Sequence, residues 1–114
     1  MPFAPTQEAQ LVIVRIWRGH APSSNPFAYG EHFTRKVLPE LERIEGFLGA
    51  SLLRQDGPDH VEFLVLTRWA SMDAIRAFAG DDVGSAVVEP DAVAALASFD
   101  RTVQHYEVVQ EIAR

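Results

Sequence analysis

One histidine lies where a side chain could take part in proton transfer. His105 is in the middle of the run FDRTVQHYEVV, and an unperturbed imidazole titrates near neutral pH. It is therefore our candidate for moving a proton, and the alternative is an exposed histidine or one at a dimer edge. Tyr106 would point to the opposite face of a strand, so at most one of these two side chains lines a pocket.

An arginine and two tryptophans also lie in apolar runs. Arg15 is part of LVIVRIWR and shares a strand face with Trp17. An arginine in these surroundings could bind an anion, but it could also reach the strand edge or pair with an acid across a dimer. Trp69 shares the parity of Phe63 and Val65, so it faces one layer, where core packing is the alternative to lining a pocket.

Two His-x-Glu pairs could suggest a metal. His60 with Glu62, and His105 with Glu107, each place two potential ligands on one strand face. A site of histidine and carboxylate ligands needs all its donors to converge. The predicted sheet order separates these two strands by another strand, so we expect no metal site. There is also no cysteine, no phosphate-binding glycine loop and no Gly-x-Ser-x-Gly motif, so nucleotide and acyl-transfer enzymes lack support.

The composition is that of one globular domain. The 114 residues are 47% hydrophobic with mixed charges, and no apolar run approaches the length of a membrane span. A net charge of −6 argues against nucleic acid and anionic membranes as partners. The start MPFAPTQEAQ lacks the features of a signal peptide and is expected to be loose, and the absence of cysteine fits a cytoplasmic location.

Hydrophobic periodicity and turn residues predict the elements that position these side chains. Strands are expected over residues 11–18, 47–55, 61–69 and 99–109, and helices over residues 25–46, 72–80 and 90–97. Asn25 and Pro26 suit the start of the first helix, which Pro39 should kink or break. Ser71 should cap the second helix, and Gly80 should end it.

The order strand, helix, strand, strand, helix, strand predicts a ferredoxin-like α+β fold, with a four-stranded antiparallel sheet and the helices on one face. The first and third strands are apolar at both parities, with Val14 and Leu66 on one face and Ile13 and Val65 on the other. The open face of the sheet therefore needs a cover. A twofold homodimer packed sheet against sheet, which is a dimeric α+β barrel, is the simplest solution.

Several stretches carry a resemblance to a known family. They are RIWRG, LPELERIEGFLGASLLR, EFLVLTRWASMDAIRAFAG and FDRTVQHYEVV. Together they resemble the antibiotic biosynthesis monooxygenase family of dimeric α+β barrels, over residues 11–109. The resemblance implies a homodimer with a pocket in each subunit between sheet and helices. In characterised members that pocket oxidises polycyclic phenols with O₂ and without metal or flavin, and a related branch binds and degrades haem.

Only some of the pocket residues of this family have a counterpart in this sequence. Trp69 matches a pocket tryptophan of both branches. The asparagine that both branches place on the first strand has no counterpart among residues 15–18, and the histidine ligand of the haem branch is missing from residues 72–80. The resemblance therefore implies a cofactor-independent monooxygenase that acts on a small aromatic molecule. The alternative is a non-catalytic module of the same fold, which binds an apolar ligand or only dimerises.

The expected site combines these residues. His105 would take the substrate proton, Arg15 would hold the resulting charge, and Trp69 would complete the catalytic group. The apolar slot for the aromatic rings would be formed by Trp17, Phe33 and Phe78. We expect no cofactor and no metal. The expected partners are a second copy of the chain and a small aromatic or apolar molecule.

Overall fold

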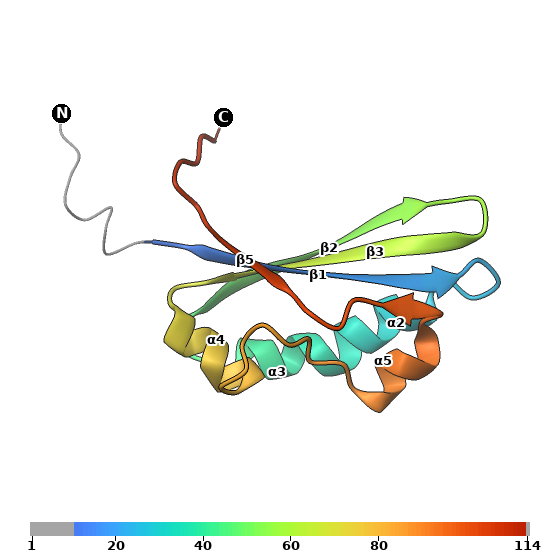
Figure 1. The fold of residues 1–114 in the computed structure, drawn as a ribbon, viewed down its shortest axis with the longest axis horizontal. Coiled ribbons are helices and arrows are strands. Elements are labelled where there is room, and N and C mark those ends of the chain that lie inside the picture. Colours follow the sequence, from blue (N-terminus) through green and yellow to red (C-terminus); the bar gives the residue numbers. More distant parts are fainter. Residues whose placement is uncertain (1–10, 114) are drawn as a thin grey trace.

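The computed structural model describes residues 11–113 and has two layers, a single antiparallel sheet and a set of helices that all pack on one of its faces (Figure 1). In chain order the elements are β1 (Ile13–Pro22), α2 (Ala28–His32), the π-helix η1 (Phe33–Val37), α3 (Leu38–Glu42), β2 (Phe47–Asp56), β3 (His60–Trp69), α4 (Met72–Ala79), α5 (Pro90–Ala95), β4 (Ser98–Phe99) and β5 (Gln104–Glu107). None of the helices over these residues is long and apolar enough to cross a membrane. The α+β architecture is as predicted, and the second copy that would complete a barrel stays a prediction.

Strand β1 is the centre of the sheet. The order is β2-β3-β1, and both β4 and β5 pair with the other edge of β1, all antiparallel. The register places Arg15 opposite Thr67 of β3 on one side and opposite His105 of β5 on the other. Residues directly opposite each other project to the same face of a sheet. Three polar side chains therefore start side by side on the face that carries the helices.

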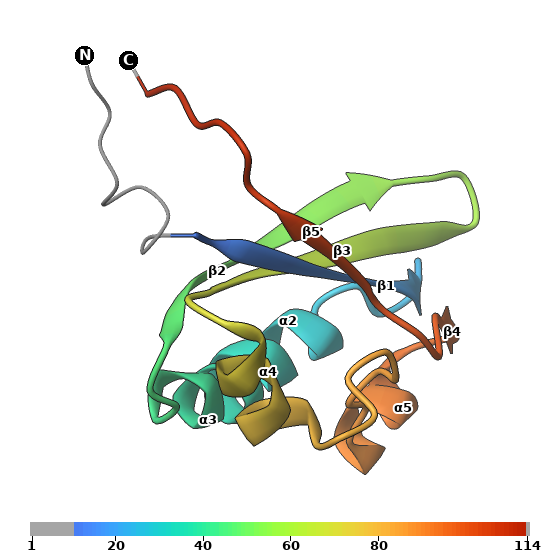
Figure 2. The ribbon, with the colours of Figure 1, turned by 60° about the vertical axis from the view of Figure 1, so that its left-hand side comes forward.

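The last part of the sheet corrects the prediction of one strand over residues 99–109. Two short strands, β4 and β5, are separated by a segment that leaves the edge of β1 (Figure 2). The Trp17 indole donates to the Asp100 carbonyl at 2.7 Å, and the Val103 N–H donates to the Gly84 carbonyl at 2.9 Å. The Asp100 N–H still donates to the Arg18 carbonyl of β1 at 2.9 Å, whereas the Val103 N–H pairs with the segment before α5 and not with β1. The sheet over the described residues therefore has five strands where four were predicted.

The first helical region begins later than predicted. Helix α2 starts at Ala28, and the residue in the capping position, Phe27, makes no side-chain capping bond. Asn25 lies two residues before the capping position, and its own N–H donates to the Pro22 carbonyl at 3.0 Å and closes the preceding turn. The prediction of a helix start at Asn25 and Pro26 is therefore wrong.

Pro39 disturbs the same region without ending the helix. The turn before it is π-helical, and the Leu38 N–H bonds to the Phe33 carbonyl five residues back. Proline has no N–H, and its ring crowds the carbonyl four residues earlier, that of Arg35. A wider π turn relieves this crowding while the chain stays helical. The predicted disturbance thus takes the form of a π segment, and the helical path continues into α3.

The second helix agrees with the prediction. The Ser71 hydroxyl accepts a bond from the Ala74 N–H at 3.1 Å, and Gly80 follows the helix with a φ of 83°. The short helix α5 begins at Pro90, as predicted, and ends at Ala95. The hairpin of β2 and β3 is also confirmed.

The two faces of the sheet differ in what covers them. On the helix face, alternate residues of β1 and β3 are buried and form the core together with the helices. On the other face, no part of the described chain packs over the half-buried Val14, Ile16 and Leu66, and Tyr106 is 57% exposed. The predicted apolar open face is therefore present.

Candidate active site

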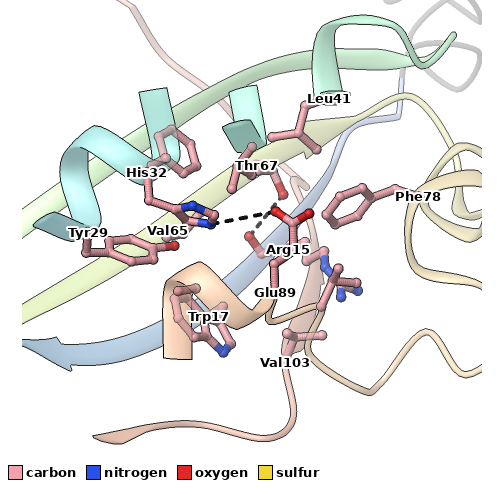
Figure 3. A pocket seen from close by; sticks show the side chains of 14 residues that line it. Arg15, Trp17, Tyr29, His32, Leu41, Val65, Thr67, Phe78, Glu89 and Val103 are labelled. Atoms are coloured by element: carbon pink, nitrogen blue, oxygen red, sulfur yellow. Dashed lines mark hydrogen bonds and ion pairs between the residues drawn. The ribbon is translucent and has the colours of Figure 1, made fainter. Parts of the chain in front are cut away.

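A small cavity lies between the helix face of the sheet and the helices (Figure 3). Its volume is about 50 Å³. The larger apolar side chains that line it are Trp17, Phe33, Val37, Leu41, Val65, Phe78, Val87 and Val103. The polar side chains that line it are Arg15, Tyr29, His32, Thr67 and Glu89. The cavity therefore combines mostly aromatic and aliphatic walls with a few ionisable groups, the usual make-up of a small-molecule site.

Arg15 supplies the positive charge of the cavity. It is 5% exposed, and its guanidinium donates to the Val83 carbonyl at 2.7 Å, to the Ser85 carbonyl at 3.0 Å and to His105 Nε2 at 3.0 Å. The charge also lies 5.8 Å from the centre of the Phe78 ring, within cation–π range. These contacts hold the guanidinium in one place, so it does not reach the solvent-exposed strand edge.

No carboxylate of residues 11–113 lies within ion-pair distance of Arg15. Burial lowers its pKa to about 10, because the low-dielectric surroundings disfavour the charged form. At neutral pH the guanidinium still carries its charge. A buried cation without a counterion is costly, so an anion that entered the cavity would be attracted to it.

His105 supports Arg15 from outside the cavity. Its Nε2 faces a donor, and arginine has no acceptor, so Nε2 accepts and the ring proton is assigned to Nδ1. Burial, together with the charge of Arg15, lowers the pKa of His105 below its ordinary value. His105 is not among the residues that line the cavity. The prediction that it takes a substrate proton therefore stays a prediction.

Trp69 lies behind the cavity wall and is fully buried. Its indole N–H donates to the Thr67 hydroxyl at 2.8 Å, and Thr67 in turn lines the cavity. Its ring stacks against Phe78 with centroids 5.8 Å apart and meets Phe47 edge-on at 5.4 Å. Trp69 therefore positions two residues of the wall, Thr67 and Phe78, and is not itself exposed to the cavity.

The remaining sequence candidates divide between the cavity and the surface. Trp17, Phe33 and Phe78 line the cavity together with Arg15. Tyr106 is on the opposite, exposed face of the sheet, as the alternation with His105 predicted. The structure thus brings together four of the six predicted site residues, with His105 and Trp69 each one contact away.

Sequence reasoning missed Tyr29, His32 and Glu89. Burial raises the pKa of the Tyr29 hydroxyl above its ordinary value, so the phenol stays protonated at neutral pH. His32 Nε2 lies 3.6 Å from the Glu89 carboxylate, at the point where the α2 side of the cavity meets the segment before α5. The apolar stripe of the helix, traced back one turn from Phe33, would have reached Tyr29 and His32. No periodicity marks Glu89, which precedes a short helix.

The His-x-Glu pairs do not form a metal site. His60 and Glu62 are on β3, and His105 and Glu107 are on β5, with β1 between the two strands. Over residues 11–113 no group of three histidine or carboxylate side chains is arranged to hold a metal ion.

Solved structures of the same fold are numerous. A putative antibiotic biosynthesis monooxygenase of Bacillus cereus is 19% identical, with a TM-score of 0.64 over 90% of this chain and 98% of that one. A haem-degrading protein of Mycobacterium tuberculosis is 25% identical, with a TM-score of 0.63 over 91% and 98%. A cofactor-independent oxygenase of Streptomyces nogalater is 18% identical, with a TM-score of 0.55 over 90% and 95%. These similarities support the fold of the chain.

The sequence itself carries the family assignment. No curated protein matches the chain. Residues 25–89, more than half of the sequence, match the family described as antibiotic biosynthesis monooxygenase. This stretch runs from the first helical region through the β2–β3 hairpin and α4, and so contains most of the cavity wall. The chain belongs to the antibiotic biosynthesis monooxygenase family.

Proposed function

We propose that this protein is a cofactor-independent monooxygenase that oxidises a small phenolic aromatic molecule with O₂. The observation that carries the proposal is the buried Arg15 guanidinium, which faces an aromatic-walled cavity and has no carboxylate partner in the described chain. A phenolate is the anion that this combination suits, because its ring fits the apolar walls and its oxygen fits the cation. Membership of the family supports the same reaction class.

The chemistry needs no cofactor if the substrate becomes an electron-rich anion. The substrate reacts as the phenol tautomer of a ring ketone that carries a CH₂ group. The phenol O–H loses one proton, and the resulting anion, whose charge is shared with that ring carbon, passes one electron to O₂. The radical pair then joins through a new C–O bond to give a peroxide. Protonation gives the hydroperoxide, and loss of water leaves a ring carbonyl, so CH₂ and O₂ become C=O and H₂O. The protein has to create the anion, hold its charge and exclude water.

Arg15 has the donors for the second of these tasks. A guanidinium carries five N–H groups, and the described chain engages three of them, at Val83, Ser85 and His105. Two N–H groups are left for a ligand oxygen. Because the other three fix the guanidinium in advance, little reorganisation is needed when the anion forms.

The size of the cavity limits what it accepts without rearrangement. Its volume is about 50 Å³, whereas a dry cavity of roughly 150 Å³ is the size known to admit benzene. An aromatic ring therefore enters only if lining side chains move. Val87 and Glu89 of the wall follow the isolated bridge between Ser85 and Thr102 and lie outside any helix or strand, so we expect their side chains to move first.

Haem does not fit this site. A porphyrin is far larger than a cavity of about 50 Å³. Helix α4, Met72–Ala79, also carries no histidine, the ligand that the haem-degrading branch places on its second helix. The activity of the haem-degrading protein of Mycobacterium tuberculosis is therefore not extended to this chain.

The proposal is tested by O₂ consumption with anthrone-like phenols, in the parent and in the variant Arg15→Gln. Loss of one donor to a developing oxyanion typically lowers kcat about 10²- to 10³-fold, and we expect a loss in that range. The matched control is Arg76→Gln, which makes the same change at an exposed arginine on α4 whose partner is Asp73. Turnover by Arg15→Gln at the parent rate would remove Arg15 from the site.

The second candidate function is a non-catalytic module that binds an aromatic anion. The observation in its favour is the same guanidinium, which has no carboxylate partner among residues 11–113, because holding an anion does not by itself require turnover. Calorimetric binding of the phenol without O₂ uptake would establish this alternative.

A further inference from the structure

His32 lies in the wall between the cavity and the protein surface. On one side it lines the cavity, and on the other it lines an open groove between α2, η1 and α5. The groove has a volume of about 350 Å³ and also contains Glu31, Arg35, Lys36 and Asp91. The His32 side chain itself is only 6% exposed. It is therefore a buried imidazole with the cavity on one side and a solvent-filled groove on the other.

Both ring nitrogens of His32 lack a hydrogen-bond partner within the described chain. Buried imidazoles that serve only the fold are normally fixed by bonds to backbone or side-chain groups, because an unsatisfied buried polar atom destabilises the protein. The lining of the cavity includes other polar groups, so the ring is not enclosed by apolar atoms alone. The neutral His32 ring therefore has one N–H donor and one acceptor nitrogen that no group of the described chain engages in a hydrogen bond.

The Glu89 carboxylate is placed to stabilise a proton on this ring. Its Oε1 lies 3.6 Å from His32 Nε2, and its side chain is 37% exposed. Figure 3 shows the imidazole directed at this carboxylate among the residues of the cavity. The other ionisable groups that face His32 are Tyr29 on its own helix, Arg15 across the cavity and the four groove residues named above. Of all these ionisable groups and Glu89, it is the Glu89 carboxylate that lies within ion-pair distance of the imidazole.

We propose that His32 is the base that creates the substrate anion, and that Glu89 connects it to solvent. This inference rests on the proposed function and names the residue that starts its reaction. The O–H bond of the phenol breaks, its proton forms an N–H bond on the imidazole, and the electron pair stays on the phenolate oxygen beside Arg15. After O₂ has added, the imidazolium returns the proton to the peroxide, and the neutral ring is restored.

This assignment differs from the prediction made for His105. The Nε2 atom of His105 is occupied by Arg15, and His105 does not line the cavity. His32 lines the cavity, and neither of its nitrogens makes a hydrogen bond within the described chain. His105 is then a positioning residue that acts through the guanidinium.

The first experiment measures ionisation without turnover. The probe is 4-nitrophenol, a single-ring phenol whose phenolate absorbs at longer wavelength than its neutral form, bound anaerobically near pH 6. We expect the parent to raise the bound phenolate fraction above that in buffer, and His32→Gln to lose this increase. His60→Gln, at an exposed histidine of β3, is the matched control and should behave as the parent. No increase in the parent, or an equal increase in His32→Gln, would overturn the inference.

The second experiment measures turnover and chemical rescue. A positioned base typically contributes about 10²- to 10⁴-fold, so His32→Ala should lower the rate of O₂ uptake with an anthrone-like phenol by a factor in that range. The open groove should admit free imidazole, which should restore uptake of His32→Ala in proportion to its concentration and leave His60→Gln unchanged. Circular dichroism of both His32 variants verifies that they fold. A folded His32→Ala that turns over at the parent rate contradicts the inference, and so does a loss that imidazole does not relieve.

The two proposals fail in different ways. If the parent ionises the bound phenol in a His32-dependent manner but consumes no O₂, the base assignment stands and the monooxygenase proposal falls. If the parent consumes O₂ and both His32 variants do so equally, the monooxygenase proposal stands and the base assignment falls.

Discussion

Replacing His32 by leucine should make the protein more stable. The wild-type ring is buried, and neither nitrogen has a hydrogen-bond partner in the described chain. Leucine has a similar volume and no polar atoms, so it can fill the same space beside Tyr29 without leaving a donor or acceptor unpaired. The variant therefore removes an unfavourable term and creates no large cavity.

The expected gain in stability of His32→Leu can be estimated from the free-energy cost of an unsatisfied buried polar group. Such a group destabilises a protein by about 1–3 kcal/mol, and we expect a gain in unfolding free energy in that range. For a domain of this size 1 kcal/mol corresponds to about 4 °C, so the melting temperature should rise by about 4–12 °C. The 3.6 Å ion pair with Glu89 subtracts little, because the carboxylate is 37% exposed and can be hydrated when the ring is gone.

The assay is urea and thermal unfolding at pH 8, above the range in which imidazoles ordinarily titrate, at one fixed protein concentration. His60→Leu is the control. His60 is exposed on β3, and a surface substitution usually changes stability by less than about 0.5 kcal/mol. If His32→Leu loses more than about 1 kcal/mol, the imidazole is a satisfied core residue, and the argument that it waits for a ligand is refuted.

Three further outcomes are expected. Gly46 has a φ of 95°, and a Cβ there would lie 2.6 Å from the Cβ of Ala74, so Gly46→Ala should cost at least about 1–3 kcal/mol, measured as a lower urea midpoint. The lowered pKa of His105 means that the unfolded chain binds its proton more tightly, so stability should fall as pH drops below about 6.5, and His105→Gln should fall less steeply over pH 7.5 to 5. Light scattering at micromolar concentration should give twice the mass of one chain, because the open face of the sheet is apolar, and a monomer would contradict the predicted dimer.

Local sequence signals were enough to predict most of the helices and strands. The caps at Ser71 and Gly80 are set by neighbouring residues, and the turn between β2 and β3 likewise depends on a few adjacent side chains. The break in the last strand could not be predicted in this way. It depends on the Trp17 indole and on the Gly84 carbonyl, whose bonding partners are distant in the sequence. Such bonds are decided by packing of the whole chain.

The site residues also differ in whether local sequence or long-range packing determines their positions. Strand parity was sufficient to place Arg15 and Trp17 on the same face of the sheet, but it did not decide that this face carries the helices. The contact between Arg15 and His105 depends on the register of β1 with β5, and no sequence pattern reveals a register between strands 90 residues apart. His32 was missed because the helical stripe was read from Phe33 onward, although the residue before it faces the same cavity.

One segment links the charge of the cavity to its base. Residues 81–89 supply the Val83 and Ser85 carbonyls that hold Arg15, and the same segment ends in the Glu89 carboxylate beside His32. A ring too large for about 50 Å³ has to displace part of this wall. The Val87 and Glu89 side chains line the cavity and can move while the Val83 and Ser85 carbonyls stay on Arg15. The guanidinium then keeps its position and its two remaining N–H groups for a phenolate oxygen. The cost of opening the cavity is then offset by the ligand itself, and an apolar ring without an acidic oxygen gains no such compensation. We therefore expect the proposed site to bind ionisable phenols more tightly than neutral aromatics of the same size.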